Sequence, residues 1–113
     1  ELKKFQTGNI NIIFTSSACL LTLNQKYLNH NHHTDVITFD YSADKRISGD
    51  IYIGIEKVRE NSRIFNVVLE NELRRVMIHG ILHLTGYHDR NDSERRIMRK
   101  MENEALNLWV ETA

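Results

Sequence analysis

The sequence predicts an α+β fold, in which one small domain over residues 1–113 packs a mixed sheet of three to four strands against four to five helices. Segments with strand-like alternation come early in the chain, and segments with helical spacing fill its second half. A chain of 113 residues is about one domain long. Its 41% apolar and 27% charged residues are typical of a globular protein and exclude a disordered or collagen-like chain.

The first half of the chain predicts a strand, a helix and then a hairpin. Residues 9–14 are rich in β-formers, and the hydroxyl side chains at 15–17 can cap a helix over about residues 18–28. Residues 34–41 alternate between apolar and polar side chains, and so do residues 47–54. The polar connector between these two strands indicates a hairpin.

The second half predicts three helices. Helical spacing begins at Ile55 and indicates a short helix that ends near Asn66. A longer helix follows, and Gly86 can end it by taking the left-handed conformation that closes many helix C-termini. Asp92 or Ser93 can cap the last helix. The residues predicted to face inward from this last helix are Ile97, Met98, Met101, Ala105, Leu108 and Trp109.

A metal site is predicted at the end of the long helix and in the turn after it. His79 and His83 are four residues apart, so their rings lie on one helix face and can share one ion. The turn at Gly86 brings the chain back under the two rings, and this places Asp89 as the third ligand. His88 is the alternative third ligand, less favoured because its spacing from the turn points it away.

The spacing from His79 to Asp89 matches that of zinc peptidases with the pattern His-Glu-x-x-His-x-x-Gly-x-x-His. Gly80 stands where those enzymes have their glutamate base, so peptide hydrolysis lacks its proton acceptor. A metal ion still lowers the pKa of bound water toward ~7, which suits an ester substrate. Two nitrogens and a carboxylate favour Zn²⁺, with Ni²⁺ or another divalent ion as alternatives. Three protein ligands leave a fourth position open, as in catalytic sites.

Basic residues follow the metal motif directly, although the net charge of the chain is zero. We expect them to hold the phosphates of a polyanionic substrate beside the metal. These residues are Arg90, Arg95, Arg96 and Arg99. Three further histidines, His30, His32 and His33, are interpreted as solvated loop residues. Cys19 is interpreted as a small core residue and has no disulfide partner, which indicates a reducing compartment.

The motif from His79 to Asp89 resembles the signature of the YbeY family of metal-dependent endoribonucleases. Two further segments resemble strands of that family in the same order: Thr-Asp-Val-Ile-Thr-Phe at residues 34–39 and Ser-Gly-Asp-Ile at residues 48–51. The resemblance extends from about residue 9 to 105 and places the metal ligands at His79, His83 and Asp89. Two positions depart from the family: Asp89 replaces a histidine ligand, and Leu28 replaces an arginine.

The resemblance implies a zinc-dependent, single-strand-directed endoribonuclease that matures the 3′ end of small-subunit ribosomal RNA and takes part in ribosome quality control. Its partners would then be ribosomal RNA and the small ribosomal subunit. The resemblance also implies a cytoplasmic location, and the sequence agrees with this expectation because it has no stretch apolar enough for a membrane span and no evident signal peptide. Two alternatives stay open: a metallopeptidase-like zinc hydrolase, and a non-catalytic ribosome-associated module stapled by its metal. The nucleophile and the general acid are not predicted.

Overall fold

Three strands form one mixed sheet in the order β1-β3-β2. The computed structural model describes residues 6–28 and 34–112. β1 (Gln6–Thr15) runs parallel to the central strand β3 (Arg46–Gly54), and β2 (Val36–Asp40) pairs with β3 in the antiparallel sense. The predicted hairpin of β2 and β3 is therefore confirmed. The parallel pairing of β1 with β3 joins segments about 40 residues apart, and the sequence patterns did not predict it.

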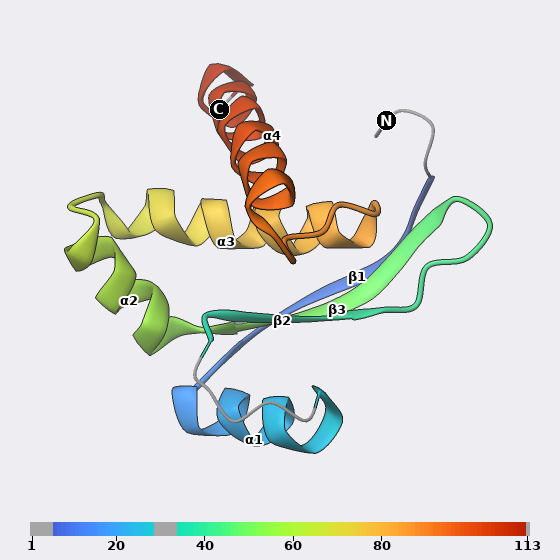
Figure 1. Cartoon of the computed structure of the whole chain (residues 1–113), viewed down its shortest axis with the longest axis horizontal. Helices are drawn as coiled ribbons and strands as arrows, with labels where there is room; N and C mark the ends of the chain where they lie inside the picture. The colour runs from blue at the N-terminus through green and yellow to red at the C-terminus, as the bar shows by residue number, and fades with distance from the viewer. Residues whose placement is uncertain (1–5, 29–33, 113) are drawn as a thin grey trace.

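Helices lie on both faces of this sheet. α1 (Ser17–Leu28) packs below the sheet in Figure 1, whereas α3 (Leu69–Leu84) covers the opposite face. α2 (Ile55–Ile64) leads from β3 into α3, and α4 (Asp92–Thr112) crosses α3 (Figure 1). The predicted α+β class and the predicted order of elements are confirmed, with three strands and four helices in the described part of the chain. None of these helices is long and apolar enough to cross a membrane.

α3 is the central helix because it packs in two directions at once. Toward the sheet, its buried Val76 and Leu84 join Ile51 and Ile53 of β3 in the larger apolar cluster. Toward α4, two other buried apolar residues of α3 pack with Met98. A helix that is apolar on both sides in this way must be covered on both sides. The remaining strip of α3 carries His79 and His83.

The inward face predicted for α4 is confirmed at Met98, Met101 and Ala105, but three other predicted core positions, on α4 and α1, are wrong. On α4 the side chains of Ile97 and Leu108 are exposed, and buried Glu102 joins Met98 instead. On α1 the side chain of Cys19 is exposed, and Leu20 is buried next to it. The side chain of Trp109 and the histidines at 30, 32 and 33 lie outside the described residues.

Gly80 shows why this helix cannot carry the glutamate of a zinc peptidase. A Cβ atom at this buried position would lie 2.8 Å from Cγ2 and 3.0 Å from Cδ1 of Ile51. Ile51 is fully buried in the central strand, and its branched side chain has little room to move. The glycine lets α3 approach β3 closely, so its identity follows from packing.

We predict that Gly80→Ala lowers the melting temperature by several degrees and that Gly80→Glu lowers it more. Overpacking of a core commonly costs about 1–3 kcal/mol, partly offset at Gly80→Ala by the better helix propensity of alanine. Thermal unfolding followed by circular dichroism measures the change. The cost of Gly80→Ala should shrink when Ile51→Ala is also present, because the two side chains are in contact. Equal costs in both backgrounds would contradict this account.

Candidate metal centre

The turn after α3 brings the third predicted ligand to the two histidines. Gly86 has a φ of 103°, and its N–H donates to the carbonyl of His83 over 3.1 Å. The N–H of Tyr87 donates to the carbonyl of Leu82, also over 3.1 Å. These two bonds form the Schellman motif that closes a helix around a left-handed residue. The predicted role of Gly86 is confirmed, and the reversed chain carries Asp89 under the rings.

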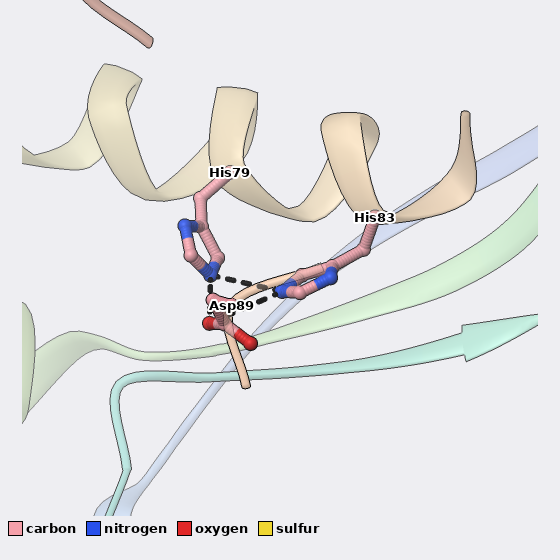
Figure 2. A group of neighbouring side chains, drawn as sticks. All are labelled: His79, His83 and Asp89. Carbon is pink, nitrogen blue, oxygen red and sulfur yellow. Dashed lines mark hydrogen bonds and ion pairs between the residues drawn. The ribbon is translucent and has the colours of Figure 1, made fainter. Parts of the chain in front are cut away.

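Three possible ligand atoms converge at this point. The Nε2 atoms of His79 and His83 are 3.0 Å apart. Oδ2 of Asp89 lies 3.2 Å from Nε2 of His79 and 3.5 Å from Nε2 of His83. Figure 2 shows both rings pointing away from α3 toward the carboxylate. Within the described residues, this is the group of histidine and acidic side chains that can hold a metal ion.

The hydrogen bonds on the far side of the two histidine rings determine which ring nitrogen faces Asp89 without a proton. Nδ1 of His79 lies 2.6 Å from Oε2 of Glu102, and Nδ1 of His83 lies 3.0 Å from the carbonyl oxygen of Tyr87. An ionised carboxylate and a backbone carbonyl can only accept, so each Nδ1 carries the proton and donates it. In the neutral rings, both Nε2 atoms then present lone pairs to each other and to Asp89.

Such a set of acceptors fits a bound cation. Two lone pairs and a carboxylate at 3.0–3.5 Å repel one another unless a proton or a metal ion lies between them. Zn–N bonds of about 2.0–2.1 Å in a tetrahedral site separate neighbouring ligand atoms by roughly 3.3 Å. The three observed separations lie around that value. The residues present therefore fit a zinc-sized ion, bound by nitrogen and oxygen.

Glu102 is the supporting residue that the sequence reasoning missed. Its side chain is buried, and besides His79 it accepts a hydrogen bond of 3.0 Å from Arg75. Burial opposes ionisation, but the hydrogen bonds from His79 and Arg75 outweigh it and lower the pKa of Glu102. A carboxylate behind a histidine ligand fixes the ring and raises its basicity. One signal was available: Glu102 lies four residues after buried Met98, on the same helix face.

The two rings have opposite tendencies to take up a proton. Burial disfavours the charged form of His79, but the hydrogen bond to Glu102 and its negative charge outweigh this and raise the pKa of the ring. Burial and the neighbouring His79 lower the pKa of His83. His79 is therefore the ring that takes up a proton more readily, and a metal ion would compete with that proton.

Two cavities border the site, one on each side. The first, of about 280 Å³, lies toward α4, and we name it the α4 cavity. Its lining residues are Asp35, Val36, Asn61, Phe65, Glu72, Arg75, Val76, His79, Asp89, Arg95, Met98, Arg99 and Glu102. The second, of about 500 Å³, lies toward β2, and we name it the β2 cavity. Its lining residues are Asn24, Thr34, Asp35, Val36, Ile37, Thr38, Asp40, His79, His83, His88 and Asp89.

Similarity to known proteins agrees with this geometry. The family model described as endoribonuclease YbeY matches residues 1–110. The chain belongs to the YbeY family. An endoribonuclease YbeY of Flavobacterium psychrophilum is 55% identical over 90% of this chain and 73% of that protein. A YbeY of Bacteroides fragilis is 50% identical over 88% and 71% of the two chains. The solution structure of a Thermotoga maritima protein superposes with a TM-score of 0.59 at 35% identity, covering 91% of this chain and 71% of that one.

Membership of the YbeY family confirms the resemblance inferred from the motif and, at the level of the family, the prediction of a metal-dependent nuclease. It does not assign individual residues. The structure brings His79, His83 and Asp89 together as predicted, whereas the alternative ligand His88 is exposed and lines the β2 cavity. Asp35 was quoted only as part of a strand motif, yet it lines both cavities beside the site.

The four predicted phosphate-binding arginines separate into two groups. Arg95 and Arg99 line the α4 cavity, whereas Arg90 and Arg96 line neither cavity. Arg90 donates three hydrogen bonds to the carboxylate of Glu94. The bonds from the Arg90 side chain are the main reason that the pKa of Glu94 is lowered to about 2. Arg95 also pairs with Asp92, and it donates over 3.3 Å to the carbonyl of Asp89.

We predict that Glu102→Gln weakens metal binding by about 10- to 100-fold. The amide keeps the shape of the side chain but removes the negative charge behind His79, and such changes commonly cost that much affinity. Competition with a zinc-binding dye measures the affinity. Glu104→Gln is the matched control, since Glu104 lies on the same helix with an exposed side chain. Equal affinity in both variants would show that Glu102 does not tune the ligand.

Proposed function

We propose that this YbeY-family chain is a zinc-dependent endoribonuclease, with the ion held by His79, His83 and Asp89. The observation that carries the proposal is the convergence of three acceptor atoms at the border of two cavities. Three protein ligands leave a position for substrate, whereas structural zinc sites are closed by four. The bound ion would act as a Lewis acid on a phosphodiester oxygen.

The residues around the ion have distinct tasks in this proposal. Glu102 and the carbonyl of Tyr87 keep a proton on each Nδ1 and hold both rings in the ligating orientation. The turn at Gly86 fixes the distance between Asp89 and α3. Glu72 is a buried carboxyl group on the wall of the α4 cavity, and burial, together with the charge of Asp35, raises its pKa.

The substrate is proposed to be single-stranded ribosomal RNA at the 3′ end of the small-subunit RNA, reached on the small ribosomal subunit in the cytoplasm. The family and the names of its relatives support an RNA substrate. The charges of the α4 cavity indicate that a bound cation is needed before the cavity attracts RNA. Four carboxyl groups and three arginines line this cavity, so a divalent cation makes it net positive toward a phosphate chain.

The two alternative functions are weaker. A metallopeptidase needs a base at position 80, and Gly80 packs against Ile51 where no larger side chain fits. A non-catalytic metal-stapled module predicts that the metal raises the melting temperature while RNA is never cut. The experiments below distinguish it from an enzyme.

We predict that His83→Ala and Asp89→Ala lose the bound ion together with RNA cleavage, by more than about 100-fold. Loss of a residue behind a ligand alone commonly costs about 10- to 100-fold, and loss of a ligand should cost more. Elemental analysis of the purified proteins and cleavage of ribosomal RNA give the two readouts. His88→Ala is the control and should keep both. Undiminished cleavage by metal-free protein would refute the proposal.

We also predict that Arg99→Ala weakens binding of single-stranded RNA about tenfold and reduces its salt dependence. A hydrogen bond to a charged group is worth about 1.5–3 kcal/mol, and each lost phosphate contact lowers the salt slope by about one. Fluorescence anisotropy at several salt concentrations measures both quantities. Arg96→Ala is the matched control, because Arg96 is exposed on the same helix but lines neither cavity. Equal losses in the two variants would place the RNA elsewhere.

A further inference from the structure

An aromatic ring on the wall of the α4 cavity stands out from its surroundings. Phe65 has 59% of its surface exposed, yet it lines the same cavity as His79 and Asp89. Other apolar side chains near the turn between α2 and α3 are also exposed, but unlike Phe65 they line neither cavity. The neighbouring exposed side chains are Ile64, Val67, Val68 and Leu69.

The backbone that carries this ring is held in place by a helix-closing turn. Asn66 takes a left-handed φ of 54°, and its N–H donates to the carbonyl of Arg63 over 3.2 Å. The N–H of Val67 donates to the carbonyl of buried Ser62 over 3.0 Å. These are the two bonds of a Schellman motif, the same device that ends α3. The backbone at Phe65 is therefore held in place, so binding a ligand requires ordering of the ring alone.

The cavity that Phe65 lines also carries three arginines and four carboxyl groups. Arg95 and Arg99 reach into it from α4, and the metal-ligand group lies beside them. An exposed ring, arginines and a metal site around one cavity match the parts of a nucleotide: a base to stack, a phosphate to pair and a phosphodiester to cut. Among the described residues, the lining of the β2 cavity includes no arginine, lysine, phenylalanine, tyrosine or tryptophan. The two sides of the site are thus chemically unequal.

We propose that the α4 cavity is a subsite for one unpaired nucleotide of the RNA, whose base stacks on Phe65 while its phosphate pairs with Arg95 and Arg99. This inference rests on the proposed function and adds an orientation to it. A base that is already paired cannot offer its face to the ring, so the subsite requires single-stranded RNA at that position. Only the nucleotides on one side of the cleaved bond should need a base, because the ring lies on one side of the metal site.

Binding of end-labelled oligoadenylates to metal-loaded protein tests the subsite, with cleavage followed separately on the same strands. One strand carries all its bases, and in the others a single abasic residue is moved along the chain. We expect Phe65→Ala to weaken binding of the complete strand about tenfold, in the range known for base stacking. At one abasic position, the affinity of wild-type protein should fall by the same factor. The affinity of Phe65→Ala should not fall further at that position. Phe65→Trp should restore the binding.

The matched control is Phe14→Ala, since Phe14 is 52% exposed on β1 and lines neither cavity. Its binding should equal that of wild-type protein. Thermal unfolding of each variant verifies that the fold is kept. Equal binding by Phe65→Ala and wild type, or a loss that is the same at every abasic position, would overturn the subsite. If the metal-loaded wild type binds RNA through Phe65 but never cleaves it, the subsite stands and the proposed enzymatic function fails.

Discussion

The hydrogen bond between His79 and Glu102 is the interaction on which the arrangement of the site depends. It joins α3 to α4 at 2.6 Å, and Glu102 is shielded from water on the inner face of α4. An isolated buried carboxylate is costly, so Glu102 requires the donors of both His79 and Arg75. The same hydrogen bond therefore fixes both the packing of α4 on α3 and the orientation of the His79 ring. A helix displaced along α3 would leave a buried charge without partners.

The three neighbours of α3 explain why one strip of it remains available for chemistry. One side approaches β3 so closely that position 80 has room only for glycine. A second side packs apolar residues against Met98 of α4. The histidines occupy what is left, between the sheet and the returning chain after Gly86 (Figure 2). Fold and site thus compete for the surface of a single helix, and the i, i+4 spacing of the ligands follows from the narrow strip that packing leaves free.

Local features were predictable from the sequence, and contacts between distant segments were not. The spacing of His79, His83 and Asp89 around Gly86 spans eleven residues, so helix and turn geometry alone brings them together. Glu102 lies 23 residues from His79 and resembles one more charge on an amphipathic helix. Its role depends on the crossing of α4 over α3, which no local pattern contains. For the same reason, Ile97 and Leu108 were placed inward although their side chains are exposed.

The basic residues show the same limit in a second way. Arg90 and Arg99 look alike in a run of cations, but they differ in the structure. Arg90 lies just before α4 and pairs with the carboxylate of Glu94, whereas Arg99 lines the α4 cavity. Their difference arises from the direction in which the chain leaves the turn at Gly86. α4 returns across α3 on one side of the metal ligands and supplies arginines to that side only, while β2 and α1 supply amide, hydroxyl and carboxylate groups to the other. An RNA strand bound as proposed would meet different chemistry on the two sides of His79, His83 and Asp89. The path of the chain after Gly86 would then favour one direction of the bound strand.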